Sequence, residues 1–479
     1  MIANFCDLCL RRRQRDFTVA SDAEFEAWAL RDMDPSFICP CCLGLLQFGK
    51  PIVDSLRAKF DELNYTDIFS CPLSVQLPAL MVFRNFVEKV AFTSTNPEIR
   101  FVDVREVLRN LITRSVLTEN PSDEMPKLFL EVKIVESAPD WVLPDEVVKA
   151  INIAESDRGS RWKRVKTKFT ANIADVQKYI ESTTGDLSKV FDSLMPAEAS
   201  VTDKAQSLID SFITAQPPVP TVKVCLKRET LYLVGKYVKD TREFGQSAWD
   251  SNATSVAETI CPIVCQLFRS PVDKCLFSAS GREDMDVRML APGRTFILQL
   301  GDARSLEPLL EKSILSDLRI DTGDVKVESG LKFVDKGVMD WLHWSTEQHR
   351  KTYRCIVWTH QVLPSQAGLN MMTETKKDIK IYQKTPLRVL HRRAEHTREK
   401  YIHRIEFERL NDHFVLVTLQ ASAGAYIKEF VHGDLLRTEG CFSNLVFGAN
   451  WCRCDILQLD VLEVEQDEEE EYVPLAERD

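Results

Sequence analysis

Three carboxylates, Glu283, Asp284 and Asp286, stand within four positions near the middle of the chain. Arg282 and Arg288 bracket them. Charges set between apolar segments are costly unless they are paired. The cluster is therefore either a salt-bridged surface turn or an acid held ionised by guanidinium groups for work as a nucleophile or a base.

Two strands must position these acids. Cys275–Phe277 has the character of a strand end, and Ser278–Gly281 that of a turn. Pro292–Thr295 predicts a second turn, and Phe296–Leu300 a buried strand. The apolar periodicity of Ser255–Phe268 predicts an amphipathic helix that leads into the cluster.

Further strands are expected on both sides of the acids. Val222–Leu226 and Thr230–Tyr237 predict a hairpin just after the proline-rich segment that ends at Pro220. Thr352–Trp358 alternates apolar and polar residues as a strand does. A second hairpin is expected over 402–420 and a closing strand over Asp455–Val461.

Two Cys-x-x-Cys pairs near the N-terminus predict a metal site. They are Cys6 with Cys9 and Cys39 with Cys42, and 29 residues separate the pairs. Each pair can place two thiolates on one tetrahedral ion, so together they predict a closed structural zinc site. The first 342 residues contain no histidine, which excludes a histidine ligand here. The alternative is two chance pairs of buried thiols.

Composition narrows the class of protein. The 479 residues are 44% hydrophobic and 28% charged, typical of a globular protein. No apolar run reaches the ~18 residues of a membrane-spanning helix, and no secretory signal peptide is found. Fourteen cysteines without such a signal indicate a reducing compartment, so we expect the nucleus or the cytoplasm. The phosphate-binding glycine motifs are absent from the sequence, and no nucleotide cofactor is expected.

Local charge indicates a nucleic-acid partner despite a net charge of −11. Residues from Glu463 onward contribute −8 to that total and predict an acidic disordered tail. Lys376–Arg404 carries a local charge of +7, and Arg158–Lys168 carries +6. Local basic runs, rather than the global charge, are typical of RNA-binding surfaces.

Four stretches together resemble one enzyme family, the archaeal and eukaryotic tRNA pseudouridine synthases of the TΨC arm, the tenth pseudouridine synthase family. They are Ser280–Arg288, which resembles the catalytic turn, and Lys384–Arg393, Ala425–Asp434 and Asp455–Val461. The cysteine pairs ahead of an accessory region also match that family. The resemblance is specific over about residues 220–462 and weaker over 50–215.

The resemblance implies an α+β protein. Its catalytic domain would have the mixed or antiparallel sheet of pseudouridine synthases, and its accessory domain would be α/β with a THUMP element. The implied domains are a zinc module at 1–48, an RNA-binding THUMP-containing domain at 49–215, a catalytic domain at 216–462 and the acidic tail at 463–479.

The resemblance also implies roles for single residues. Asp284 would be the catalytic carboxylate, and Lys428 the cation paired with it. Tyr353 would stack on the flipped uridine and serve as a general base, although its pattern equally fits a core residue. The remaining expected substrate contacts are Tyr426, Ile427, Leu459, Arg282, Arg392 and Arg393. Glu283 and Asp286 are expected to pair with nearby arginines (Arg282, Arg288 or Arg294).

The partner implied is tRNA, modified at position 54, 55 or both by a monomeric enzyme that needs no cofactor beyond the structural zinc. Two other functions are considered. A metal-dependent glycosyltransferase would hold a divalent cation on Asp284 and Asp286, but the adjacent arginines would compete with the metal. A non-catalytic zinc-containing RNA-binding or tRNA chaperone protein would use the basic runs alone and would not need Asp284.

Overall fold

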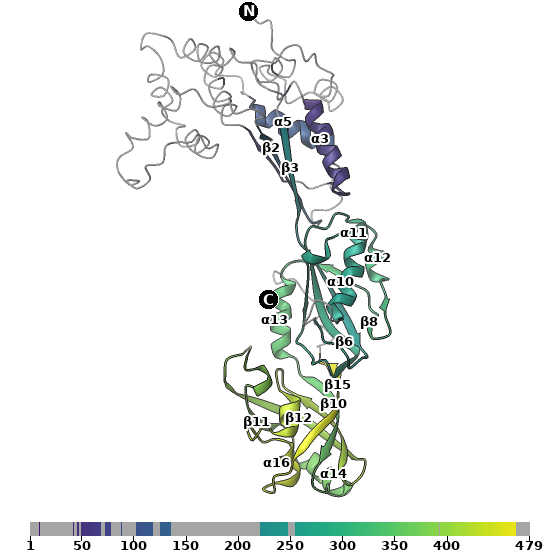
Figure 1. The fold of residues 1–479 in the computed structure, drawn as a ribbon, viewed down its shortest axis with the longest axis vertical. Coiled ribbons are helices and arrows are strands. Elements are labelled where there is room, and N and C mark those ends of the chain that lie inside the picture. The colour runs from purple at the N-terminus through teal and green to yellow at the C-terminus, as the bar shows by residue number, and fades with distance from the viewer. Residues whose placement is uncertain are drawn as a thin grey trace, which may run out of the picture. The chain divides into compact units, whose positions relative to one another are not determined.

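The structure is a computed structural model, and it describes residues 9, 42, 46, 49–68, 72–77, 88, 102–117, 125–135, 221–247, 254–391 and 393–465. The chain divides into two compact units, Met1–Glu229 and Thr230–Asp479 (Figure 1). The basic run at 158–168, the proline-rich segment at 216–220 and residues 466–479 of the acidic tail lie outside the described residues.

The described residues of the first unit form a three-stranded mixed sheet with two helices. β1 (Leu73–Gln76) runs parallel to β2 (Leu128–Val135), which pairs antiparallel with β3 (Thr221–Arg228). The helices are α3 (Gly49–Glu62) and α5 (Val104–Val116).

Sequence explains where α5 begins and which face it buries. The Asp103 side chain accepts a hydrogen bond from the Arg105 amide at 2.6 Å, which caps the helix N-terminus. Val107, Leu108 and Leu111 recur at helical spacing and are buried. They form one apolar core with α3 and the sheet.

The predicted hairpin of Val222–Leu226 with Thr230–Tyr237 is wrong. β3 continues the antiparallel ladder of β2, and the Glu229 amide extends it by donating to the Lys127 carbonyl at 2.9 Å. β4 (Leu231–Lys239) belongs to the second unit. A short polar connection between two alternating strands has the local pattern of a hairpin turn, but here it joins two sheets. The first unit therefore ends at Glu229, beyond the expected boundary at 215.

The second unit is built on a 12-stranded mixed sheet in the order β14-β11-β12-β13-β10-β15-β6-β4-β8-β7, with β5 paired to β6 and β9 to β4. Among the described strands of this sheet, β15 and β6 pair in parallel and all other pairs are antiparallel. The expected mixed sheet is confirmed. Its remaining strands are β5 (Cys275–Ala279), β6 (Val287–Leu300), β7 (Ile320–Asp321), β8 (Val325–Val327), β9 (Lys332–Val334), β10 (Lys351–Thr359), β11 (Ile379–Lys384), β12 (Thr397–Arg409), β13 (Phe414–Ala421), β14 (Thr438–Glu439) and β15 (Cys454–Val464).

Helices flank this sheet. α10 (Val256–Leu267) begins at Ser255, whose hydroxyl oxygen accepts a hydrogen bond from the Glu258 amide and caps the helix. The same hydroxyl donates to the Glu258 carboxylate. α10 and α13 (Val338–Gln348) lie on different sides of the strands around β6 (Figure 1). The others are η1 (Val272–Lys274), α11 (Glu307–Leu310), α12 (Lys312–Ser316), α14 (Gln366–Thr375), η2 (Leu387–Val389), α15 (Ile427–His432) and α16 (Phe442–Phe447). Among the described residues, no helix is long and apolar enough to cross a membrane.

Both faces of β6 are buried. Ile297 packs with Trp341 and Leu342 of α13, and Phe296 stacks on Phe277 of β5 with ring centroids 5.2 Å apart. Residues buried on alternate faces are typical of a central strand covered on both sides. This buried strand leads directly from the acidic cluster.

The predicted turn at Pro292–Thr295 is a bulge within β6. Tyr237 of β4 faces Arg294, while Lys239 faces Met289, so β6 has extra residues between these two pairs. Gly293 lies there with φ +93, and a Cβ on it would stand 2.7 Å from the Tyr237 carbonyl oxygen. Glycine is required because the backbones approach so closely.

Candidate active site

The acidic cluster lies in the loop that joins β5 to β6. The Ser280 amide donates to the Thr295 carbonyl at 2.9 Å where the loop begins, and the Val287 amide donates to the Asp284 carbonyl at 3.1 Å where it ends. Val287 then faces Leu459 in the parallel pairing of β6 with β15. The acids are therefore held where β6 and β15 meet inside the continuous sheet.

Asp284 stands between two cations. Arg388 of η2 donates from Nη1 to both carboxylate oxygens, at 3.0 and 2.9 Å. Lys428 Nζ, on the first turn of α15, lies 3.2 Å from Asp284 Oδ2. The Asp284 side chain is 40% exposed. A carboxylate that is paired and still open to solvent can meet a substrate without first breaking a buried contact.

Lys428 is shared with Asp286, whose two carboxylate oxygens both lie 2.7 Å from Nζ. Burial alone raises the pKa of Asp286, but the hydrogen bond and the charge of Lys428 outweigh burial and lower it. The sequence led us to expect that Asp286 would pair with an arginine. Its carboxylate pairs with Lys428 instead. Its role is to hold Lys428 beside Asp284.

Glu283 faces the opposite way and is fully buried. Its carboxylate lies 2.9 Å from Arg294 Nε and accepts hydrogen bonds from the Tyr237 hydroxyl at 2.8 and 2.9 Å. Gln246 donates to the same hydroxyl at 2.9 Å and to the Gly281 carbonyl at 2.9 Å. Burial, followed by the charge of Glu283, raises the pKa of Tyr237 well above its ordinary value. The expected pairing of Glu283 with a nearby arginine is confirmed. This buried ion pair anchors the loop between β5 and β6.

A third ion-paired group ties the loop to β15. Asp460 receives a bidentate contact from Arg288, at 2.8 Å from Nε and 2.6 Å from Nη2, and a further contact from Arg242. Arg242 Nη1 also donates to the Asp286 and Leu459 carbonyls at 3.0 and 2.6 Å. Arg288 therefore pairs across the strands and not with its neighbours in the sequence. Nothing in the local spacing pointed to Asp460.

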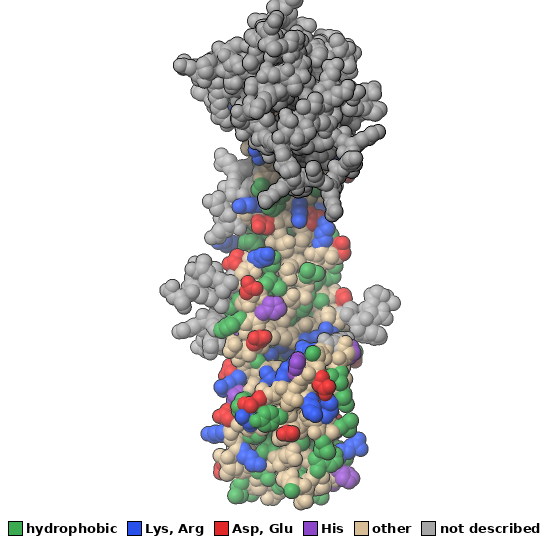
Figure 2. All heavy atoms as spheres, turned by 90° about the vertical axis from the view of Figure 1, so that its left-hand side faces the viewer, with side chains coloured by type: hydrophobic (Ala, Val, Ile, Leu, Met, Phe, Trp, Pro, Cys, Tyr) green, Lys and Arg blue, Asp and Glu red, His purple; other side chains and the backbone are tan. Residues whose placement is uncertain are grey.

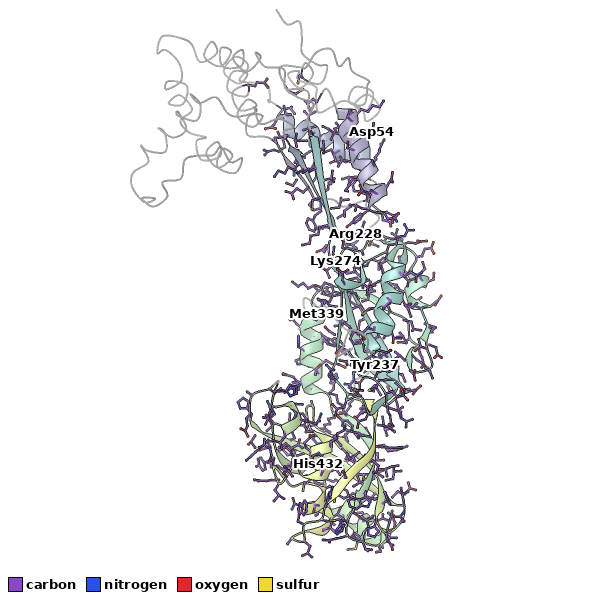
Figure 3. The ribbon with its side chains drawn as sticks, viewed as in Figure 1. Asp54, Arg228, Tyr237, Lys274, Met339 and His432 are labelled. Carbon is purple, nitrogen blue, oxygen red and sulfur yellow. The ribbon has the colours of Figure 1, made fainter. Side chains whose placement is uncertain are left out.

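The expected pocket residues lie on three different elements. Tyr353 of β10 is half-buried, and burial raises the pKa of its hydroxyl to about 12, although the charge of Arg294 opposes this. At neutral pH the hydroxyl keeps its proton, so Tyr353 is suited to stacking or to donating a hydrogen bond. Ile427 and Leu459 are buried, at 4% and 6% exposure. Figure 3 labels Tyr237, which lies on β4, and His432, which ends α15.

Tyr426 precedes α15 and is held by Gln383 of β11. The Gln383 side chain donates to the Tyr426 carbonyl and accepts from its amide, both at 2.9 Å. Arg393 Nη1 donates to the Tyr426 hydroxyl at 2.9 Å. Arg393 and Arg282 are exposed, while Arg392 lies outside the described residues. Gln383 of β11 thus fixes the backbone of Tyr426, and Arg393 of the basic run contacts its hydroxyl group.

Two residues of the site were not singled out from the sequence, Arg388 and Glu429. Arg388 donates from Nε to Glu429 Oε1 at 2.7 Å, on the side away from Asp284, and Nη2 donates to Oε2 at 3.3 Å. Burial lowers the pKa of Arg388, but Glu429 and Asp284 outweigh burial and raise it. Arg388 lies inside the matched stretch Lys384–Arg393, and Glu429 directly follows Lys428. Their positions in these stretches of the sequence were the signal that could have assigned them to the site.

The structure describes two of the four cysteines that were predicted to bind zinc. Cys9 and Cys42 are both fully buried in the apolar core of the first unit, and the Leu46 amide donates to Cys42 Sγ at 3.3 Å. Cys6 and Cys39 lie outside the described residues. Within the described ranges, no group of three histidine, cysteine, aspartate or glutamate residues could hold a metal ion. At the acidic cluster, cations of the protein itself occupy the carboxylates, which is unsuited to the divalent cation of a glycosyltransferase.

Comparisons with known proteins show which family this chain belongs to. A family model described as "Pus10, C-terminal" matches residues 232–465. A human protein named tRNA pseudouridine synthase Pus10 is 32% identical over 455 residues, which are 90% of this chain and 78% of that protein. A protein of the same name from Pyrococcus furiosus is 32% identical over 248 residues, covering 52% of this chain and 60% of its own length.

Among solved structures, a Cbf5-Nop10-Gar1 complex matches 49% of this chain and 50% of its own chain, with a TM-score of 0.26 and 13% identity. A similarity at that level carries no argument. The similarity to the human protein covers 90% of this chain. The chain belongs to the Pus10 family of tRNA pseudouridine synthases.

Proposed function

We propose that this chain converts uridine to pseudouridine in the TΨC arm of tRNA, at position 54, 55 or both, with Asp284 as the catalytic carboxylate. Membership of the family makes it an isomerase. The observation that carries the finer proposal is the half-exposed Asp284 held between Arg388 and Lys428. No observation favours a non-catalytic RNA chaperone, for which an ion-paired acid held open to solvent would be unnecessary.

The reaction is an isomerisation, so it needs no redox group. The C1′–N1 bond of the uridine breaks, the uracil turns, C5 bonds to C1′, and the proton on C5 moves to N1. An ionised carboxylate must act at the sugar, either as a nucleophile or as a base. Asp284 suits this role because its carboxylate is open to solvent and lies beside the two cations Arg388 and Lys428.

A uridine inside folded RNA must leave its stack to reach Asp284. Tyr353 supports this step because its half-buried ring and protonated hydroxyl suit stacking and hydrogen bonding. Tyr426, Ile427 and Leu459 complete the proposed pocket around the base. The cations Lys428 and Arg388 remain at the carboxylate, where they would offset its charge before and after it reacts.

The basic run supports the contact with RNA. Lys376 is exposed at the end of α14, and Lys380, Lys384 and Arg393 are exposed on β11 or between β11 and β12. Lys, Arg and His side chains lie close together on one face of the second unit (Figure 2). Positive side chains on one surface bind the phosphate backbone and set the register of the RNA. Arg282 and Arg392 are further proposed contacts to the RNA.

We propose that the first unit is a THUMP-containing RNA-binding domain. One face of its sheet is exposed and carries Phe129 on β2 opposite Lys227 on β3, and Lys133 opposite Lys223. Like charges directly opposite each other on one face destabilise a strand pair. A polyanion over this face would relieve that repulsion, and an aromatic ring among lysines suits nucleic acid.

We propose a structural zinc held by Cys6, Cys9, Cys39 and Cys42. The described residues fit such a site: the Cys9 and Cys42 thiols are buried in one core, and an amide points at Cys42 Sγ. Four thiolates leave no open position, so the metal would stabilise the fold and take no part in the reaction. The monomeric state and the nuclear or cytoplasmic location stay predictions.

The test is to incubate the purified chain with an unmodified tRNA transcript and map pseudouridine nucleotide by nucleotide. Transcripts with cytidine at position 54, at 55 or at both assign the target. Pseudouridine at one or both positions supports the proposal. Modification elsewhere, or none with a folded chain that binds tRNA, contradicts it.

A further inference from the structure

Arg388 contacts two acids from two different elements at once. Nη1 binds both oxygens of Asp284, at 3.0 and 2.9 Å, while Nε and Nη2 bind Glu429, at 2.7 and 3.3 Å. The guanidinium plane therefore joins the loop between β5 and β6 to α15 through η2. A planar fork of donors can satisfy two carboxylates in fixed directions, which a lysine ammonium cannot do.

The two acids differ in burial, and this difference assigns their roles. The Glu429 side chain is 2% exposed, whereas that of Asp284 is 40% exposed. A buried carboxylate without a cation is strongly unfavourable. Glu429 therefore holds Arg388 in place even when the charge or the contacts of Asp284 change. Asp284 is the partner that remains free to engage a substrate.

The charges along this part of the site alternate in the order Asp286, Lys428, Asp284, Arg388 and Glu429. If Asp284 loses its charge during the reaction, Lys428 remains paired with Asp286, and Arg388 remains paired with Glu429. Neither cation becomes an unpaired charge when that happens. The arrangement is organised in advance for a change of charge at Asp284.

We propose that Arg388 is a positioning residue for the reaction, fixed from behind by the buried Glu429, and that it orients the Asp284 carboxylate toward the sugar. This inference rests on the proposed function of Asp284. Arg388 lies within the basic run, so the alternative is that it contacts an RNA phosphate. Its use of four donor contacts on two carboxylates favours positioning.

The test measures single-turnover pseudouridine formation and tRNA affinity separately. Arg388→Gln is expected to lower the rate about 10²-fold, a usual cost of a misplaced reacting group, and to leave the dissociation constant within about threefold, because phosphate contacts elsewhere dominate affinity. Arg388→Lys should fall between the two rates. Arg319→Gln is the matched control. Arg319 is exposed, lies outside the basic run and the acidic cluster, and donates to backbone carbonyls.

Two further measurements separate positioning from folding. Arg388→Gln leaves Glu429 buried without its cation, so the double variant Arg388→Gln/Glu429→Gln removes both charges and restores a neutral pair. It should fold and remain slow. Free guanidinium ions should partly restore the rate of Arg388→Ala, and should not restore that of Asp284→Asn.

The outcomes distinguish this inference from the proposed function. A double variant that folds and turns over at the normal rate overturns the role of Arg388. A normal rate with weakened tRNA binding in Arg388→Gln also overturns it and assigns Arg388 to the RNA. If instead Asp284→Asn is fully active, the catalytic assignment itself is wrong.

Discussion

Glu283 and Asp284 are adjacent in the chain, yet their carboxylates lie in opposite environments. Glu283 is 1% exposed and paired with Arg294, while Asp284 is 40% exposed and paired with Arg388 and Lys428. Successive side chains of an extended segment point to opposite sides, so one loop supplies both an anchor and a reactive group. The salt-bridged turn and the catalytic acid, which were alternatives in the sequence, are both present in this loop.

Glu283→Gln should destabilise the protein by about 3–5 kcal/mol, because the buried Arg294 would lose its counter-charge. Chemical unfolding of the variant and the parent measures this difference. Asp286→Asn is the control, since Asp286 is 64% exposed, and it should change the free energy of unfolding by about 0.5 kcal/mol or less. Equal unfolding midpoints for Glu283→Gln and the parent would show that the buried pair does not stabilise the loop.

Lys351 should make stability depend on pH. Burial lowers the pKa of this lysine to about 8, with Arg294 and Lys400 adding to the effect. An unfolded lysine titrates near pH 10.4, so between about pH 8 and 10 the unfolded chain binds more protons and stability rises with pH. Below pH 8 the penalty for the buried charge is present in full.

Lys351→Met removes that penalty and should stabilise the protein at pH 7 by about 1–3 kcal/mol. The advantage of the variant should shrink as pH rises toward 10. Unfolding free energies at several pH values test this expectation. A difference between variant and parent that stays constant from pH 7 to 10 would exclude titration of Lys351 as its source.

Zinc content should follow the paired cysteines. Elemental analysis is expected to find about one zinc per chain, and Cys9→Ser should lower that amount and loosen the first unit. Cys225→Ser is the control, because Cys225 is exposed on β3 of the same unit. A Cys9→Ser protein that keeps its full zinc would remove Cys9 from the site.

Reversing Arg392 and Arg393 to glutamate should weaken tRNA binding and flatten its dependence on salt, by about one unit of slope for each lost phosphate contact. Affinities at several salt concentrations measure this. Arg319→Glu controls for the change in net charge. Unchanged affinity at low and moderate salt would show that the two arginines do not contact the RNA.

Removal of residues 466–479 should leave pseudouridine formation intact.

The sequence predicted those parts of the fold that depend on local pattern. The alternating strand at β10 and the amphipathic helix at α10 follow from residue periodicity and are present. The connection at Glu229 was misread because a turn between two strands has the same local pattern whether they pair with each other or with different sheets. Such pairing depends on contacts distant in sequence, which no local pattern contains.

The site shows the same division. The pairing of Glu283 with Arg294 was predictable because both lie near one turn. The contacts of Asp284 with Arg388 and of Asp460 with Arg288 join residues more than 100 positions apart. Position within a basic run favoured an RNA role for Arg388, while its buried partner Glu429 could be identified only from the packing of α15.

The role of Asp284 is tested most directly by Asp284→Asn, which keeps the shape of the side chain and removes its charge. The measurement is single-turnover pseudouridine formation on an unmodified tRNA transcript, with tRNA affinity and unfolding measured on the same protein. We expect no detectable product, affinity within a few-fold of the parent and normal folding, because affinity resides in phosphate contacts elsewhere. Turnover at the parent rate by Asp284→Asn would contradict the catalytic role of Asp284, and loss of folding or of tRNA binding would assign Asp284 to the structure of the loop.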